Sequence, residues 1–319
     1  MMQPSIPSQM KAAALDHFGG PEVLHTETLP VPEPGEGEIL LKVDTAGIGV
    51  WDPWVREGGL DAGSTRFPYV MGNDGAGEVI AVGPNVRRFR VGDRAYAYQM
   101  EGGFYAEYVR LKENRAARIP RGVDPKAAGA LGADGITALR GLDDQLGLKA
   151  GQSLMIFGAS GGIGHLAVQL AKRMSARVLA VASRQDGVDL VRRLGADAAI
   201  DGRTEDVAQA ARAFAPEGLD AALVLVHANG LEAALKAVKK GGRIAFPNGV
   251  EPEPKVPQGV ELRAYDGVPS AEALDRLNQL IGDAPFHVEL GRVFSLDEVA
   301  RAHQVIGEHH LGKLALRIH

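Results

Sequence analysis

The chain has 319 residues, enough for two packed domains, and its 45% hydrophobic and 24% charged content is typical of a folded globular protein. The net charge of −5 gives no positive field for nucleic acid or acidic membranes. The absence of cysteine excludes disulfides, thiolate metal sites and a catalytic cysteine. No apolar run reaches about 18 residues, and the first nine residues do not resemble a signal peptide. We therefore expect a cytoplasmic protein without membrane or nucleic-acid partners.

Residues 1–120 are rich in glycine, proline and short β-type runs. Three prolines between positions 30 and 34 mark an extended connector. The pattern predicts strands at Met10–Leu15, Gly37–Asp44, Gly77–Val82 and Arg94–Tyr98. We expect these strands to form a twisted, mostly antiparallel β domain.

From about Asp124 onward, predicted helices alternate with short apolar strands, which indicates βαβ units and a doubly wound parallel sheet. The predicted strands are Ser153–Phe157, Arg177–Val181, Ala198–Ile200, Ala221–Val226 and Arg243–Phe246. The predicted helices between them are Gly162–Met174, Val188–Leu194, Val207–Ala213 and Leu231–Val238.

Three prolines between positions 252 and 257 interrupt this alternation, and a helix is predicted at Ala271–Leu280. From about Pro285 we expect a strand, the helix Leu296–Ile306 and the strand Leu314–Ile318 to rejoin the first domain. The sequence thus predicts an α/β protein with a β-rich domain over 1–120, a dinucleotide-binding domain over 121–267 and a return over 268–319.

A glycine-rich loop lies between the first predicted strand and helix of the second domain. Glycines permit a tight turn and close approach of the backbone to a pyrophosphate, and the helix start offers free N–H groups. Ala159 takes the place usual for the first glycine of this fingerprint. The predicted cofactor-binding residues of the loop are Ala159, Ser160, Gly161, Gly162, Ile163 and Gly164.

The end of the second predicted strand indicates which dinucleotide binds. NAD enzymes usually place an acid there to hold the ribose hydroxyls, whereas this strand is followed by Ser183 and Arg184. These donors favour a 2′-phosphate and therefore NADPH. Arg203, after the third strand, is a second candidate, and a solvated loop charge is the alternative for both arginines. Asn248, after the fifth strand, completes the predicted cofactor-binding set.

The order of several short motifs resembles the zinc-free quinone oxidoreductase branch, the zeta-crystallin type, of the medium-chain dehydrogenase/reductase superfamily. The resemblance runs along nearly the whole chain from Met10. Its motifs lie at 19–24, 72–77, 91–94, 102–108, 135–138, 158–164, 194–197 and 241–243. It implies a GroES-like catalytic domain split around a Rossmann domain, an active site in the cleft between them, and a homodimer.

The resemblance also implies where zinc-bearing relatives hold their metal. A cysteine ligand is replaced here by Gly49, and a histidine ligand by Asn73. The nine histidines show no ligand spacing. We therefore expect no metal, which disfavours alcohol oxidation and leaves hydride transfer to a polarised acceptor.

By the same resemblance, the predicted catalytic residues are Thr137, near the nicotinamide, with Asn73 and Asp52 in the cleft. A tyrosine usual in that cleft is replaced by Leu60. Trp51 and Trp54 are candidates for an apolar wall or for ordinary core packing, and Tyr69 and Tyr105 are possible proton donors. The predicted function is NADPH-dependent reduction of a small-molecule quinone or α,β-unsaturated carbonyl. The alternatives are an enoyl-thioester reductase and a non-catalytic NADPH-binding regulatory protein.

Overall fold

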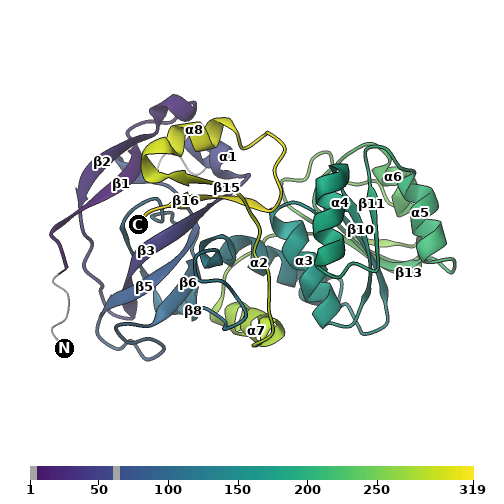
Figure 1. Cartoon of the computed structure of the whole chain (residues 1–319), viewed down its shortest axis with the longest axis horizontal. Coiled ribbons are helices and arrows are strands. Elements are labelled where there is room, and N and C mark those ends of the chain that lie inside the picture. The colour runs from purple at the N-terminus through teal and green to yellow at the C-terminus, as the bar shows by residue number, and fades with distance from the viewer. Residues whose placement is uncertain (1–5, 60–64) are drawn as a thin grey trace. The chain divides into compact units, whose positions relative to one another are not determined.

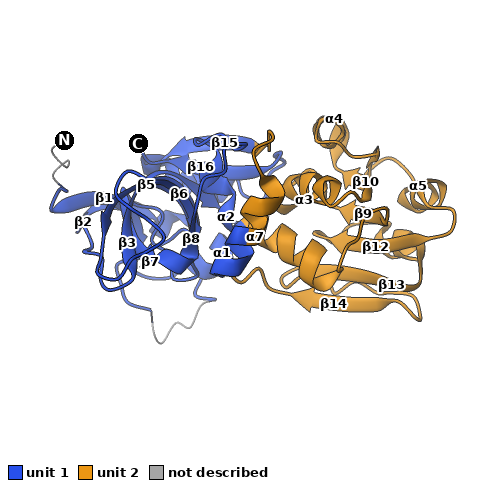
Figure 2. Ribbon diagram, turned by 90° about the horizontal axis from the view of Figure 1, so that it is seen from below, with its two compact units in different colours: residues 1–133, 269–275, 290–319 blue, residues 134–268, 276–289 orange. Residues whose placement is uncertain are grey.

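The computed structural model describes residues 6–59 and 65–319, and Figure 1 shows their course. The chain forms two compact units, drawn in different colours in Figure 2. Unit 1 comprises residues 1–133, 269–275 and 290–319, and unit 2 comprises residues 134–268 and 276–289. The first segment of unit 1 thus extends beyond the expected border at 120, and residues 276–289 belong to unit 2.

Unit 1 is built on two sheets. The larger sheet has the order β15-β16-β3-β5-β6-β8, with β7 also paired to β3, and the smaller has the order β2-β1-β4. Only the β15–β16 pair is parallel among the strand pairs of the described part of this unit, so the predicted antiparallel β domain is confirmed. The strands are β1 (Gln9–Leu15), β2 (His25–Pro30), β3 (Glu38–Ile48), β4 (Tyr69–Val70), β5 (Asp74–Val82), β6 (Arg94–Tyr98), β7 (Tyr108–Lys112), β8 (Ala116–Arg118), β15 (Leu290–Ser295) and β16 (Lys313–Arg317).

Strand β3 carries hydrophobic side chains on both of its faces. Ile39 and Leu41 are buried in the main core of the unit, whereas Leu40 is buried in a smaller cluster on the other face. Burial on both sides explains why a nearly continuous apolar run forms this strand. Short helices complete the unit: η1 (Pro21–Val23), α1 (Asp52–Arg56), η2 (Glu113–Arg115), η3 (Ala128–Ala130), η5 (Leu296–Glu298) and α8 (Val299–Gln304).

Unit 2 is a single six-stranded parallel sheet with the order β11-β10-β9-β12-β13-β14. Numbered from its first strand, this is the order 3-2-1-4-5-6 of a Rossmann sheet, as predicted. Its strands are β9 (Ser153–Phe157), β10 (Arg177–Ala182), β11 (Ala198–Asp201), β12 (Leu219–Val224), β13 (Val238–Pro247) and β14 (Glu261–Tyr265).

The helices of unit 2 follow the strands in alternation: α3 (Gly162–Arg173), α4 (Arg184–Arg193), α5 (Val207–Phe214) and α6 (Leu231–Leu235). Two further helices cross the border between the units along the chain, α2 (Gly132–Leu139) and α7 (Ala271–Ile281). Helix α2 continues directly into the π-helical segment η4 (Arg140–Gln145). Across the described residues, no helix has both the length and the hydrophobicity required to cross a bilayer.

Several predicted boundaries were wrong. The helix predicted over Leu231–Val238 ends at Leu235, because Val238 already pairs with Leu219 as the first residue of β13. Strand β14 was missed, since the prolines that precede it suggested an irregular segment. The helix predicted over Leu296–Ile306 is divided into η5 and the shorter α8.

Candidate functional site

The predicted cofactor-binding residues gather at one edge of the sheet in unit 2. All six strands are parallel, so their carboxyl ends meet at the same edge. The glycine-rich loop follows β9, Ser183 and Arg184 follow β10, Arg203 follows β11 and Asn248 follows β13. The strand order reverses between β9 and β12, which is where ligands of such sheets bind.

The loop after β9 can be understood from its glycines. A Cβ atom added at Gly164 would lie 2.2 Å from the carbonyl oxygen of Gly158, so only glycine lets α3 start this close to the strand end. At Gly161 the nearest such atom, the same carbonyl oxygen, is 3.6 Å away, an ordinary contact distance, so a Cβ atom there would not collide. Gly161 is the N-cap of α3 and offers no side-chain cap. The first N–H groups of the helix are therefore available to an anion.

The remaining loop residues support the turn. Ala159 is fully buried, and its N–H donates to the carbonyl of Val181 on the neighbouring strand at 2.9 Å. The buried Ser160 hydroxyl accepts from the N–H of Ser183 at 3.4 Å. Ser160 thus connects the loop after β9 to the residues that follow β10.

A carboxylate that the sequence analysis did not select organises the rim of this edge. Asp201, the last residue of β11, accepts from the N–H groups of Arg184 and Arg203 through the same oxygen, Oδ1, at 3.0 Å each. The N–H of Arg203, followed by other donors, lowers the pKa of Asp201. Both arginines are exposed. The sequence does contain one signal for Asp201, since it is an acid directly after the predicted third strand.

Thr137 lies on α2 in unit 2, just before the helix becomes π-helical. The Tyr265 hydroxyl donates to the carbonyl of Thr137 at 3.0 Å, and the N–H of Asn248 donates to the carbonyl of Tyr265 at 2.8 Å. A Cβ atom at Gly267 would lie 2.1 Å from the Thr137 hydroxyl. Tyr265 and Gly267 therefore hold Thr137 in place, and neither was selected from sequence.

Asn73 belongs to unit 1, and its amide is fully engaged there. Its Nδ2 donates to the carbonyls of Gln99 and Met100 at 3.0 Å each, and its Oδ1 accepts from the Trp51 indole at 3.2 Å. Both N–H donors are thus used within the unit. The side chain of Asn73 thus positions the Trp51 ring, and its expected catalytic role stays a prediction.

Trp51 occupies the space that a side chain at position 49 would need. A Cβ atom at Gly49 would lie 2.4 Å from the indole ring. The ring also faces the Lys313 ammonium, which lies 5.2 Å from the ring centroid. With glycine at 49 and an engaged amide at 73, these positions do not fit a zinc centre. Trp54, the second tryptophan considered for an apolar wall, is 56% exposed.

Asp52 is enclosed in the interior of unit 1. Its Oδ2 accepts from the N–H of Gly49 at 2.9 Å and from the Tyr105 hydroxyl at 2.5 Å. Burial raises the pKa of Asp52 to about 6, against the opposing effect of the Tyr105 hydrogen bond. The side chain is 1% exposed, and the catalytic role expected for Asp52 stays a prediction.

The two tyrosines considered as proton donors are poorly suited to that role. Tyr105 is fully buried, and burial raises its pKa well above the ordinary value. Burial raises the pKa of Tyr69 to about 12, and its hydroxyl donates to the carbonyl of Glu101 at 3.4 Å. Leu60, the other residue of interest in this segment, lies outside the described residues.

A buried ion pair in unit 1 was not visible in the sequence. The Lys313 ammonium lies 2.9 and 3.1 Å from the two carboxylate oxygens of Asp74, and the side chains are only 3% and 1% exposed. Asp74 Oδ2 also accepts from the N–H of Ala133, at the start of α2, at 3.0 Å. The pair joins β16 to β5 and fixes the beginning of this helix.

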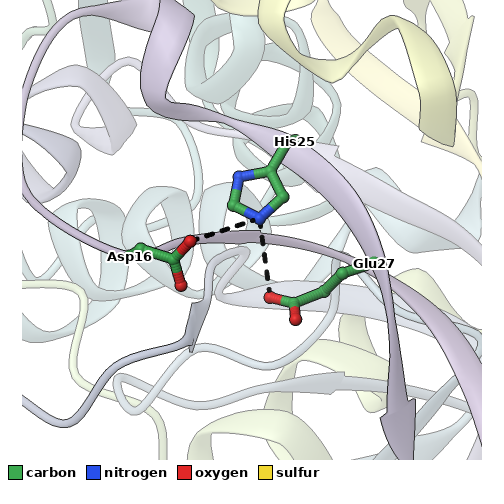
Figure 3. Close-up of side chains that lie close together, drawn as sticks. All are labelled: Asp16, His25 and Glu27. Atoms are coloured by element: carbon green, nitrogen blue, oxygen red, sulfur yellow. Dashed lines mark ion pairs between the residues drawn. The ribbon is translucent and has the colours of Figure 1, made fainter.

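A separate charged triad lies on the small sheet of unit 1 (Figure 3). His25 Nε2 is 3.5 Å from Asp16 and 3.8 Å from Glu27, and the possible ligand atoms lie within 4.8 Å of one another. Asp16 and His25 are exposed, and exposed acidic groups of this kind are common without a bound ion. The triad alone therefore does not indicate a metal site.

Comparison with known proteins gives two family-model matches. Residues 35–121 match the alcohol dehydrogenase GroES-like domain, and residues 162–260 match the family described as zinc-binding dehydrogenase. A quinone oxidoreductase of Lama guanicoe is 32% identical over 237 residues, which cover 74% of this chain and 72% of that protein. The chain belongs to the medium-chain dehydrogenase/reductase superfamily. It is a quinone oxidoreductase-like oxidoreductase of that superfamily.

Other members of the superfamily match along different shares of their length. An Arabidopsis thaliana chloroplastic NADPH-dependent alkenal/one oxidoreductase is 35% identical over 262 residues, which cover 78% of this chain and 65% of that protein. A solved structure described as an NAD-dependent alcohol dehydrogenase has a TM-score of 0.86 at 29% identity, with 97% of this chain and all of the other covered. The Coxiella burnetii quinone oxidoreductase has a TM-score of 0.82 at 26% identity, with 98% of this chain and all of the other covered.

Proposed function

We propose that this medium-chain dehydrogenase/reductase is an NADPH-dependent reductase that transfers hydride to a quinone or an α,β-unsaturated carbonyl without a metal. The observation that carries the proposal is the carboxyl edge of the sheet in unit 2. There a glycine-rich helix start stands at the point where the strand order reverses, and two exposed arginines lie on the rim.

The residues at this edge fit a phosphorylated dinucleotide. The start of α3, which has Gly161 as N-cap and no side-chain cap, suits a pyrophosphate. Ser183 and Arg184 stand directly after β10, where an NAD enzyme would usually have an acid. Asp201 is the nearest acid on the neighbouring strand, and its Oδ1 already accepts two main-chain hydrogen bonds. The rim therefore favours a 2′-phosphate.

When bound, the nicotinamide supplies the hydride. The chain contributes binding and orientation: the N–H groups of α3 bind the phosphates, and the hydroxyl of Thr137 is proposed to orient the acceptor oxygen. Tyr265 and Gly267 fix the position of Thr137. Because Asp52 and Tyr105 are enclosed, the proton that completes the reduction is proposed to come from water.

The names of the relatives support this substrate class and also define the alternatives. Two relatives are named quinone oxidoreductase and NADPH-dependent alkenal/one oxidoreductase, whereas one similar structure is described as an NAD-dependent alcohol dehydrogenase. An enoyl-thioester reductase and a non-catalytic NADPH-binding protein remain the competing functions. These three functions differ in whether an acceptor is consumed and in which one.

The test combines calorimetric titration with NADPH and NADH and an assay of NADPH oxidation. The acceptors are a benzoquinone, an enone, an enal and an enoyl thioester. We expect NADPH to bind at least about tenfold more tightly, a difference of about 1.4 kcal/mol, with turnover of a quinone or an enone. Equal affinities would contradict the cofactor assignment. Binding without turnover of any acceptor would favour the regulatory alternative, and turnover of only the thioester would favour the enoyl-thioester reductase.

A further inference from the structure

Asp201 stands at the point where three main-chain segments of unit 2 meet. As the last residue of β11, it pairs in register with Ala182, the last residue of β10. Its Oδ1 accepts from the N–H groups of Arg184, after β10, and of Arg203, after its own strand. One oxygen atom therefore joins the two segments, after β10 and after β11, that carry the exposed arginines.

The backbone of Arg184 requires such a support. Its φ angle is +64°, in the left-handed region that residues with a Cβ atom rarely adopt. The N–H of this residue points to Asp201 Oδ1 at 3.0 Å. A residue kept in a disfavoured conformation by a specific partner often marks a functional position. At Arg184 the conformation sets the direction in which the side chain leaves the rim.

Asp201 is itself anchored. Its own N–H donates to the Glu205 carboxylate at 2.8 Å, and the N–H of Arg203 is the largest of the effects that lower its pKa. A carboxylate beside a phosphate site is unfavourable by charge alone. Here two main-chain N–H groups donate to one carboxylate oxygen. The support that Asp201 gives to the main chain therefore outweighs its charge repulsion with the phosphate.

We propose that Asp201 is a positioning residue that determines the preference for NADPH, by fixing the main chain of Arg184 and Arg203 so that both guanidinium groups serve one 2′-phosphate. This inference rests on the proposed function, since it assumes a 2′-phosphorylated cofactor at this edge. Asp201 does not contact the cofactor in this role. Removal of an acid is therefore expected to weaken the binding of an anion.

Two substitutions separate geometry from charge. Asp201→Asn keeps an oxygen acceptor for both N–H groups, whereas Asp201→Ala removes it. In titrations with NADPH and NADH, we expect Asp201→Ala to weaken NADPH binding roughly tenfold and to leave NADH binding within about twofold. Asp201→Asn should retain the full preference of the unchanged protein. Arg184→Ala serves as the comparison for direct loss of a phosphate contact.

Hydrogen exchange at the N–H groups of Arg184 and Arg203 gives a second readout. Exchange should accelerate in Asp201→Ala and stay slow in Asp201→Asn. If both variants lose NADH affinity, Asp201 is a ribose ligand and the proposal is overturned. An unchanged NADPH preference in Asp201→Ala would overturn the proposal while leaving the proposed function intact. Equal affinities for NADPH and NADH in the unchanged protein would overturn both.

Discussion

The charged residues singled out in the two units differ in their exposure to solvent. In unit 1, charged side chains are buried: Asp52, Arg56, Asp74 and Lys313 are each at most 3% exposed. In unit 2, the carboxyl edge of the sheet relies on main-chain N–H groups, close glycine contacts and exposed arginines. A buried charge is costly without its partner, whereas an exposed one is screened by water. Unit 1 should therefore respond to substitution through stability, and the rim of unit 2 through cofactor binding.

The strongest test of this contrast is Lys313→Met. It would leave the buried Asp74 carboxylate without its cation, and we expect a loss of about 3–5 kcal/mol in the free energy of unfolding. Denaturant unfolding measures this loss. The double variant Lys313→Met with Asp74→Asn removes both charges and should recover a large part of it. If the double variant is no more stable than the single one, uncompensated charge is not the cause.

A second test of unit 1 is Asp52→Asn, measured as a function of pH. The folded-state pKa of Asp52 is about 6, above the ordinary 3.8, so the folded protein binds the proton more tightly than the unfolded chain. The unchanged protein should therefore lose stability relative to Asp52→Asn as pH rises from 4 to 7, by about 2 kcal/mol.

Two buried histidines change the stability with pH in the direction opposite to Asp52. For this reason the unchanged protein is compared with the Asp52→Asn variant. Burial lowers the pKa of His165 to about 4 and that of His303 to about 3. Both favour folding as pH rises, but both are present in either protein and cancel in the difference. A difference between the proteins that does not vary with pH would show that Asp52 is ionised in the folded state at an ordinary pKa.

In unit 2 the matched pair Gly164→Ala and Gly161→Ala separates folding from binding. A Cβ atom at Gly164 would press on main-chain atoms at 2.2 Å, and we expect a loss of about 1–3 kcal/mol in unfolding free energy. At Gly161 the nearest atom is 3.6 Å away, so this variant should fold normally and lose affinity for NADPH. Calorimetry and thermal unfolding measure the two effects. Normal NADPH affinity in Gly161→Ala would argue against a pyrophosphate above the loop.

The smallest effect is expected for Tyr265→Phe, which removes the hydroxyl that donates to the carbonyl of Thr137. The loss of one buried hydrogen bond should cost about 0.5–1.5 kcal/mol. Turnover should fall while the dissociation constant for NADPH stays unchanged, because the phosphate-binding loop is untouched. A parallel fall in NADPH affinity and turnover would indicate a general distortion of the sheet edge.

The sequence predicted unit 2 better than unit 1 for a physical reason. The glycine-rich loop, the parallel strands and the acid-free end of β10 follow from local residue patterns, and the structure has the predicted parallel sheet. The ion pair between Asp74 and Lys313 joins residues 239 positions apart, and no local pattern reveals it. Asp52 was selected by resemblance alone, and its burial depends on packing with Tyr105, which no local pattern reveals.

Local patterns also failed where a side chain binds the main chain of other residues. The sequence does not reveal the role of Asp201, because its carboxylate oxygen binds two main-chain N–H groups that only the fold brings to it. Tyr265 lies on β14, a strand that was hidden by the prolines before it. Supporting residues of this kind become visible only when the three-dimensional contacts are known.

The indole of Trp51 has a consequence for how this protein could change over time. Because the ring fills the space beside Gly49, a side chain added at 49 collides with it at 2.4 Å. A lone Gly49→Cys exchange is therefore disfavoured before the new thiol can bind anything. A side chain at 49 requires the ring of Trp51 to move, and a smaller residue at 51 would also remove the partner of Asn73. Packing thus couples positions 49, 51 and 73.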